Sequence, residues 1–286
     1  ARHAGAGPTS PLLNDEQVLE RIKLEDLLLV ALGVRPCSLV TVPGELPDGP
    51  ELLREVDRLF SHKYFYGTHP QGGSLQRLLT RWKYSAYRAA LTPLQYKSLL
   101  IRETTEEVLS AASSYRALRQ WVRRFQLELY TLEVRPSIRE LLIFRESELP
   151  RVQEVARLRQ QARAGSQEEN AAARDWASLI FPEQFAPDYL RELGSLLGYP
   201  DCCVERYAAD RQEGVIPEVR GAEDLSRWEA AGKTLAAEVY FVRDFVPCSP
   251  DCAAARRRGE AALAAFGDTD PQRLVPRYRA LLESNR

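Results

Sequence analysis

Four of the five cysteines in this chain of 286 residues stand in two tight pairs near its C-terminal end. Cys202 and Cys203 are adjacent, Cys248 and Cys252 are separated by three residues, and Cys37 lies far away in the sequence. Cysteines that serve as small core residues would be scattered, whereas paired thiols beside prolines are typical of a metal site or a redox pair. The chain is therefore expected to fold so that these two short segments meet.

Both cysteine pairs are expected at the start of a helix. Pro200-Asp201 is typical of a helix start, which puts the first pair in the first turn. Ser249 suits the N-cap of a second helix and Pro250 its first position, which puts the second pair across that start. Helix N-termini carry partial positive charge and free N–H groups, and both favour the thiolate form that binds metal.

The adjacent cysteines leave the ligand set open. Neighbouring side chains on a regular helix diverge by about 100°, so either the Cys202–Cys203 peptide is not helical or only one thiol binds metal. In the second case the fourth ligand could be Glu205, a histidine, water or substrate, and an open position is what catalysis requires. Glu205 and Tyr207 are the candidate catalytic residues. The alternative for Glu205 is a salt bridge to an arginine.

The metal is also left open. Four thiolates suit zinc, a single iron or a [4Fe–4S] cluster. The spacing is neither the CxxC…CxxC pattern of a zinc knuckle nor the ferredoxin run. The alternatives are a functional iron or iron–sulfur centre, a C-terminal part clipped together by zinc, and free thiols or a disulfide.

The composition is that of an ordinary globular protein. Apolar residues make up 44% and charged residues 28%, with a net charge of -1. This balance argues against a nucleic-acid binder that uses its whole surface. No apolar run reaches the length of a membrane span and the N-terminus lacks the apolar core of a secretory signal. We therefore expect a cytoplasmic protein with reduced thiols, no membrane partner and no nucleic-acid partner.

The expected fold is mostly α, of the α+β class, in three parts. Residues 1–13 read as a flexible leader, 14–165 as a mixed α/β part that binds substrate, and 171–286 as a helical part that binds metal. Residues 165–170 are the expected linker, because glycine and polar residues cluster there.

Local signals place the individual elements. Residues 38–42 read as a strand and 62–73 as an aromatic loop rich in glycine. Residues 127–134 and 138–145 read as a hairpin, with continuation of the preceding helix through 127–134 as the alternative. Helices are expected over residues 14–32, 51–60, 74–91, 92–112, 113–125, 147–164, 171–180, 187–197, 201–212, 223–245, 249–266 and 271–284.

Two segments combine aromatic with basic side chains and are the candidate substrate pocket. The first is the loop at 62–73, which could close over a substrate or bring a histidine to the metal. The second is the helix at 74–91, whose bases and rings could bind an anionic or heterocyclic ligand. A surface loop and a helix with its rings in the core are the alternatives. The candidate binding residues are His62, Tyr64, Tyr66, His69, Arg81, Lys83 and Tyr84.

The cysteine segments resemble those of known proteins. Residues 197–205 and 247–252 resemble a family of uncharacterised prokaryotic proteins that share a GYPxCC and a PCSxxC segment, over roughly residues 188–259. The layout is also similar to the thiolate-rich non-haem iron oxygenase that completes oxazinomycin, a C-nucleoside antibiotic. That second resemblance implies iron, dioxygen as co-substrate, a nucleoside-like substrate in the N-terminal part, and the four paired cysteines as ligands.

The first functional hypothesis is therefore an iron-dependent oxygenase of specialised metabolism that rearranges a small heterocyclic substrate. The second is a zinc-stabilised module that binds nucleic acid or a protein, and the third is an iron–sulfur enzyme. Four fixed thiolates leave no vacancy on the metal. Dioxygen would therefore need a labile ligand or an outer-sphere route.

Overall fold

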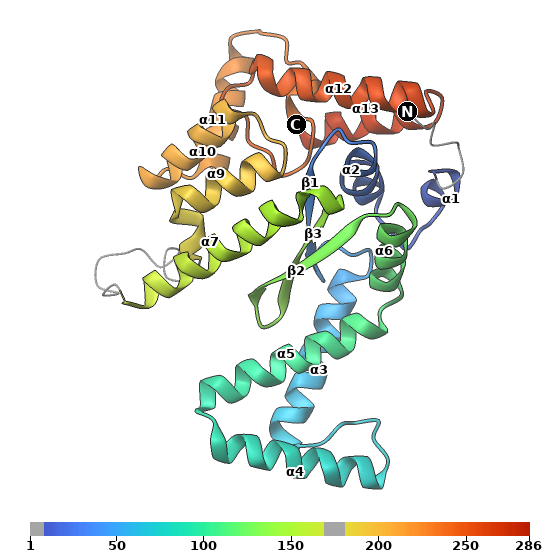
Figure 1. The fold of residues 1–286 in the computed structure, drawn as a ribbon, viewed down its shortest axis with the longest axis vertical. Coiled ribbons are helices and arrows are strands. Elements are labelled where there is room, and N and C mark those ends of the chain that lie inside the picture. The colour runs from blue at the N-terminus through green and yellow to red at the C-terminus, as the bar shows by residue number, and fades with distance from the viewer. Residues whose placement is uncertain (1–8, 169–180) are drawn as a thin grey trace.

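The structure is a computed structural model that describes residues 9–168 and 181–286, without the side chains of 165–168. It is mostly helical with one small antiparallel sheet, as predicted. Figure 1 shows a body built around the sheet, with the C-terminal helices at one end and a helical arm at the other. Within the described residues, every helix is too short or too polar to cross a bilayer.

The sheet confirms the predicted strand and hairpin. Its strands are β1 (Cys37–Val42), β2 (Glu128–Arg135) and β3 (Ile138–Phe144), in the order β1-β3-β2 with both pairs antiparallel. Alternate residues of β3 enter two different cores, because successive side chains of a strand point to opposite faces. Leu141 packs with the N-terminal helices, whereas Leu142 packs with the helices that follow the sheet.

The N-terminal region differs from the prediction. Residues 1–8 of the expected leader lie outside the described residues, but Thr9–Leu13 form helix α1, whose Leu12 and Leu13 are buried in the core. The single helix predicted over 14–32 is instead a turn followed by the π-helix η1 (Ile22–Leu28) and the short α2 (Leu29–Ala31). All seven residues of η1 are buried, so its charged side chains lie in the interior.

Three helices form the arm, which in this structure means residues 49–111. They are α3 (Gly49–Tyr66), α4 (Ser74–Ala90) and α5 (Pro93–Ala111). The predicted capping box is present, because the Thr92 side chain accepts from the N–H of Gln95 and the Gln95 side chain accepts from the N–H of Thr92. Helix α6 (Ser113–Arg124) follows and leads back to the sheet.

The predicted loop at 62–73 is too long. Helix α3 runs on through His62, Tyr64 and Tyr66 until Gly67, whose φ of 63° ends it in the left-handed conformation. Aromatic residues have a weak helix propensity, and for this reason the predicted helix ends at residue 60, six residues too early. The connection to α4 covers only residues 67–73.

The remaining elements complete the body. They are η2 (Glu146–Glu148), α7 (Leu149–Glu168), η4 (Pro182–Phe185), α9 (Pro187–Leu196), α10 (Asp201–Gln212), α11 (Pro217–Ala230), η5 (Ala237–Tyr240), α12 (Ala253–Thr269) and α13 (Leu274–Asn285). Residues 165–168 of the predicted linker continue α7. The rest of that linker and the predicted helix at 171–180 lie outside the described residues.

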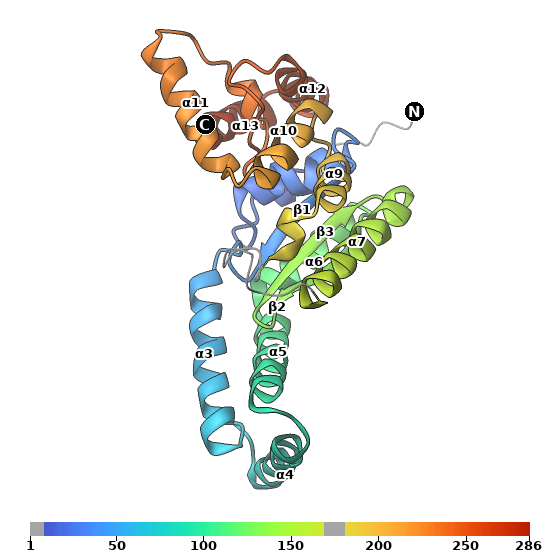
Figure 2. The same ribbon diagram turned by 90° about the vertical axis from the view of Figure 1, so that its left-hand side faces the viewer.

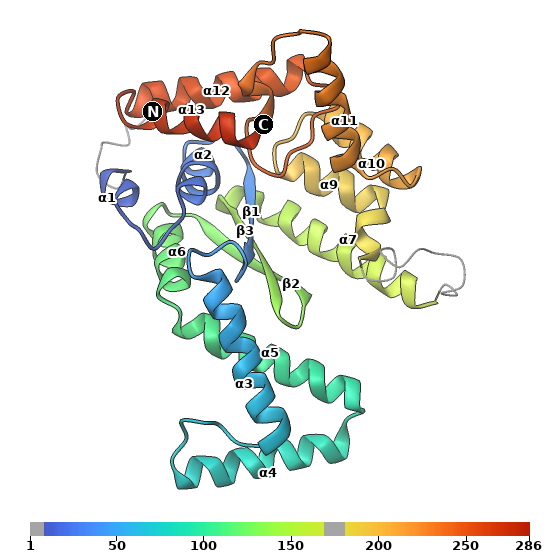
Figure 3. The ribbon, with the colours of Figure 1, turned by 180° about the vertical axis from the view of Figure 1, so that it is seen from behind.

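The long helix predicted over 223–245 is wrong. Gly232 has a φ of 66° and ends α11 at Ala230, which is the usual role of a glycine after a helix. The chain then crosses to η5 and packs against α12 and α13. Figures 2 and 3 show these C-terminal helices beside η1 and α2, so one core joins residues from both predicted parts.

Candidate metal centre and adjoining cavity

The fold brings the four paired cysteines together, and they could hold a metal ion. Their sulfur atoms all lie within 4.8 Å of one another. The Sγ atoms of Cys202 and Cys203 are 3.9 Å apart, and that of Cys252 lies 3.7 Å from the first and 3.6 Å from the second. Four sulfurs bound tetrahedrally at about 2.3 Å would be separated by about 3.8 Å. The observed spacing therefore fits one four-coordinate ion.

Helix α10 supplies the first pair. It begins at Asp201 after Pro200, as predicted, so Cys202 and Cys203 occupy its first turn. Both cysteines are helical, and yet their sulfurs point close enough together to share one ion. We expected a helical peptide to let only one of these two thiols reach the metal. The observed distance between the two sulfurs contradicts that expectation, because rotation about χ1 offsets the divergence of the backbone positions. Cys202 is exposed and Cys203 is buried.

The second pair sits on a turn and not across a helix start. Helix α12 begins at Ala253, so Ser249 and Pro250 belong to the turn that precedes it, and Cys252 is the N-cap residue. The N–H of Cys252 donates to the Ser249 carbonyl at 3.1 Å, which closes this turn. The N–H of Cys248 donates to the sulfur of Cys203 at 3.4 Å, a backbone bond that supports a bound thiolate.

The protonation of the cluster depends on burial and on N–H donors. Burial raises the pKa of Cys203, and it raises that of Cys248 to about 11. Burial acts the same way on Cys252, but hydrogen bonds from the N–H of Ala255 and from neighbouring thiols bring its pKa below the ordinary value. Burial of Cys203 and Cys248 thus opposes their thiolate forms, and a cation would have to displace their protons on binding.

Cys37 takes no part in the cluster. It lies in β1, is fully buried, and belongs to the core between the sheet and α7 and α9. Burial raises its pKa to about 12, so it behaves as an inert core thiol.

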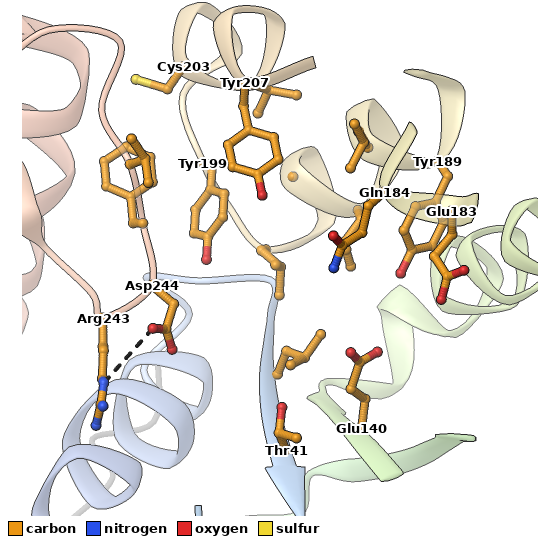
Figure 4. Close-up of a pocket in the computed structure, with 18 of the residues that line it drawn as sticks. Thr41, Glu140, Glu183, Gln184, Tyr189, Tyr199, Cys203, Tyr207, Arg243 and Asp244 are labelled. Carbon is orange, nitrogen blue, oxygen red and sulfur yellow. Dashed lines mark ion pairs between the residues drawn. The ribbon is translucent and has the colours of Figure 1, made fainter. Parts of the chain in front are cut away.

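A cavity of about 380 Å³ adjoins the cluster. Cys203 lines it together with side chains from η1, the sheet, η4, α9, α10 and the segment after η5. Figure 4 shows Tyr199 and Tyr207 with their hydroxyls directed into this space, and Thr41 and Glu140 on the sheet side opposite them. The volume suits a small molecule.

One end of the cavity carries a buried charge network. The Asp26 carboxylate of η1 accepts from Arg21 at 3.1 Å and lies 3.7 Å from Arg35. Arg21 also pairs with Glu45 at 2.7 Å. Burial raises the pKa of Asp26 to about 7, although both arginines oppose that shift. A carboxyl that titrates near neutrality beside a cavity is a candidate acid or base.

A second charge network lies at the other end. Arg159 of α7 donates to Glu183 at 2.9 Å and to Glu140 at 2.6 Å. Glu183 is almost fully buried, and although burial raises its pKa, hydrogen bonds from Arg163 and the charge of Arg159 bring it below the ordinary value. The phenol of Tyr189 stands beside these groups in Figure 4. The cavity therefore offers fixed donors and acceptors of both signs.

The two candidate catalytic residues are placed differently. Tyr207 lines the cavity, donates to Glu218 at 3.1 Å and accepts from Arg211 at 2.9 Å. Glu205 is exposed and accepts a hydrogen bond from Arg191 at 2.9 Å. This contact is the salt bridge that was the alternative interpretation of Glu205. Tyr207 thus remains a candidate through its position, whereas Glu205 faces solvent.

The predicted substrate-binding residues lie in the arm, away from the cysteines. His62 Nδ1 contacts the Thr68 carbonyl at 3.0 Å, and His69 Nε2 contacts Glu107 at 2.6 Å, so neither histidine approaches the cluster. The other predicted residues are on α3 and α4: Tyr64, Tyr66, Arg81, Lys83 and Tyr84. Figures 1 and 3 show these helices at the opposite end of the molecule from α10 and α12. Their role in binding stays a prediction, separate from the cavity beside the cysteines.

Sequence reasoning missed most of the cavity. Its charged residues are dispersed along the chain, from η1 to the segment after η5, and nothing in the sequence shows that they meet. One signal was present: Glu25 and Asp26 interrupt an otherwise apolar run within residues 24–32. Charges inside an apolar run are costly to bury unless they are paired, which marks them as candidates for a site.

The chain is similar over part of its length to a family whose activity is not known. Residues 127–268 match the model of a family described as "Protein of unknown function (DUF483)". The match spans just under half of the chain, includes all four clustered cysteines, and agrees with the predicted resemblance to an uncharacterised family. No curated protein and no solved structure matches the chain. The similarity to an iron oxygenase stays a prediction.

Proposed function

We propose that this protein is a redox enzyme that holds one iron ion in its four thiolates and oxygenates a small polar heterocycle, with dioxygen as co-substrate. The observation that carries the proposal is the position of Cys203, which belongs to the cysteine cluster and also lines the cavity. A metal that only clips two segments together needs no cavity against one of its ligands. A redox centre needs its substrate close by.

The sulfur spacing supports a single ion over a cluster. Separations of 3.6–3.9 Å leave room for one metal at about 2.3 Å from each sulfur. In a [4Fe–4S] cluster each cysteine binds a different iron, and the irons and sulfides need the space between the thiolates. The third hypothesis is therefore the least compatible with the geometry.

We choose iron over zinc because of the reaction proposed for the cavity. Iron and zinc both accept four thiolates, but iron adds the one-electron chemistry that activation of dioxygen needs. Incorporation of both atoms of one dioxygen molecule into the substrate balances the electrons without a further reductant. Because four fixed thiolates leave no vacancy, dioxygen would need either an outer-sphere route or a labile ligand, for which Cys202 is the exposed member of the set, while Cys203 faces the substrate side.

The protein residues would bind the substrate and handle its protons. The Tyr199 and Tyr207 hydroxyls and the two charge networks can hydrogen-bond the ring nitrogens and oxygens of a heterocycle. Burial raises the pKa of Asp26 to about 7, so at neutral pH it can take or give a proton as the ring is oxidised. This is the role we assign to Asp26.

A zinc-stabilised binding module is the second candidate, because the cluster also joins the start of α10 to the turn before α12. Metal in that position would hold the C-terminal helices together. This alternative needs no chemistry in the cavity.

The two candidate functions can be distinguished by purifying the protein without oxygen and measuring its metal content and its absorption spectrum. The iron proposal expects about one iron per chain and thiolate-to-iron charge-transfer bands after oxidation. It also expects oxygen uptake with some member of a panel of nitrogen heterocycles and nucleosides. One zinc and no visible colour would refute it and support the binding module.

Two serine variants test the ligand assignment. Cys248→Ser is expected to lose both iron and oxygen uptake, because a hydroxyl is a poor ligand for a soft site. Cys37→Ser is the matched control, since Cys37 lies outside the cluster, and it should keep the metal. Full metal content in Cys248→Ser would overturn the assignment.

A further inference from the structure

Helix α4 turns an uncovered apolar face outward at the end of the arm. Leu75, Leu78, Leu79 and Trp82 are 58–74% exposed. Their spacing of i, i+3, i+4 and i+7 places all four on one side of the helix. The opposite side packs on the arm through Tyr84, which is buried. The exposed face is therefore an unpartnered surface and not part of the core.

Neighbouring elements extend this surface. Phe65 and Tyr66 at the end of α3 and Leu94 at the start of α5 are 70–75% exposed. Figures 1 and 2 show α4 lying across the far end of the arm, at right angles to the long axis of the molecule. We call α4 and these two helix ends the arm tip. Soluble monomers seldom expose so many large apolar side chains in one place.

The arm tip is also strongly basic. Residues 58–102 contain eight Lys and Arg and not a single Asp or Glu, although the whole chain has 40 acidic residues. The net charge of the chain is -1, so residues outside this segment together carry -9. Arg77 and Arg81 of α4 have no acidic partner among the residues that the structure describes. Four of the eight bases pair with carboxylates outside the segment, namely Arg58, Lys63, Lys83 and Arg102. The charge that remains to meet an anion is therefore on α4, at residues such as Arg77 and Arg81.

Three kinds of partner could cover such a face, and the observations favour one. A second copy of the same tip would bring like charges together, which costs free energy. Single-stranded nucleic acid stacks on aromatic rings and would leave the exposed leucines uncovered. An anionic lipid surface accepts leucine and tryptophan between its headgroups and pairs with arginine and lysine at the same depth.

We propose that the arm tip docks on anionic membrane surfaces, with α4 lying flat among the headgroups and its leucine and tryptophan side chains inserted. The helix would lie at the surface and not cross the bilayer, in keeping with the lack of a spanning helix among the described residues. Surface docking departs from the expectation of no membrane partner, which considered only spanning segments and secretory signals. The docking is independent of the metal chemistry proposed above, because the cysteines and their cavity lie at the other end of the molecule (Figure 1).

The test is sedimentation of the full chain with vesicles of phosphatidylcholine, alone or mixed with phosphatidylglycerol. We expect binding only to the mixed vesicles, with a blue shift of Trp82 emission that Trp82→Phe removes. Arg81→Gln should weaken binding by about fivefold, and added salt should weaken it further. Arg77→Gln should have a smaller effect, because Arg77 lies two turns before Tyr84 and so on the side of α4 away from the leucines. Leu78→Ser with Leu79→Ser should weaken it by about tenfold or more.

Matched variants at the other end of the molecule control for general effects. Ile216→Ser removes an equally exposed aliphatic side chain from the boundary of α11, and Arg257→Gln with Arg258→Gln removes two exposed charges from α12. Both should bind as the unaltered chain does. No binding to mixed vesicles, or equal binding to neutral ones, overturns the proposal. So does a dimer abolished by the leucine variant, or tighter binding to an RNA oligonucleotide than to the vesicles.

Discussion

The buried carboxyl of Asp26 should make the stability of the protein fall as the pH rises towards neutrality. Burial raises its pKa from 3.8 to about 7, so between these values the folded state holds a proton that the unfolded state has released. Stability falls with pH wherever the folded state binds more protons. The loss of stability caused by Asp26 is therefore absent below pH 3.8 and complete above pH 7.

The size of the effect follows from the two pKa values. Each unit of pH between them costs about 1.4 kcal/mol, with smaller slopes near each end. From about pH 5 to about pH 7 the free energy of unfolding should fall by about 2 kcal/mol through Asp26 alone. That is a large share of the 5–15 kcal/mol typical of folded domains.

The measurement is urea unfolding of the unaltered chain and of Asp26→Asn at both pH values. The amide keeps the shape of the carboxyl and can still accept from Arg21, but it does not titrate. The difference in stability between the two proteins should shift by about 2 kcal/mol between the two pH values. Glu25, whose pKa burial also raises, titrates in both proteins and drops out of the difference.

Metal loss at acid pH affects both proteins equally and drops out in the same way. Asp188→Asn is the control, because this carboxylate is 85% exposed and its removal should leave the pH dependence unchanged. If Asp26→Asn keeps the full pH dependence of the unaltered chain, then Asp26 is ionised in the folded state and cannot be the neutral-pH acid or base of the cavity.

Three further outcomes are expected. Bound metal should be lost as the pH falls from about 8 to about 5, because protons compete for the four thiolates, and dialysis followed by metal analysis measures this. Gly259→Ala should destabilise the protein by about 2 kcal/mol in thermal or urea unfolding, because its Cβ would stand 2.8 Å from the Glu238 Cα, and the better helix propensity of alanine recovers only about 1 kcal/mol. Tyr207→Phe should cost about 1 kcal/mol in the same assay, since the hydroxyl bonds both Arg211 and Glu218.

The parts of the fold that local chemistry specifies were predictable. The capping box at Thr92, the start of α10 at Asp201 and the hairpin of β2 and β3 each depend on residues a few positions apart. The four cysteines were predictable as a group for a related reason. Thiols occur in few functional roles in proteins, and two closely spaced pairs of thiols are typical mainly of metal and redox sites.

The parts that depend on distant contacts were not predictable. The periodicity of residues 14–32 indicates one regular helix, but the packing of η1 against β1 and the C-terminal helices produces a π-helix with both Glu25 and Asp26 inside. Such helices are often found at functional sites, and their buried charges need partners that the sequence does not reveal. Asp26 pairs with Arg21 and Arg35, whereas Glu25 accepts from Asn285 and from the Arg243 N–H, both more than 200 residues away.

The aromatic and basic segments show how one sequence signal can carry two interpretations. In the sequence alone, residues 74–91 suggest a ligand pocket, because basic and aromatic side chains occur together there. The fold instead leaves the leucines and Trp82 of α4 facing solvent, at the end opposite the cysteines. His69, Lys83 and Tyr84 of the predicted binding residues line a shallow pocket of the arm, whereas the leucines and Trp82 lie on an outward surface. The small-molecule role of the predicted residues stays a prediction, and the outward apolar face supports the separate proposal of an extended anionic partner.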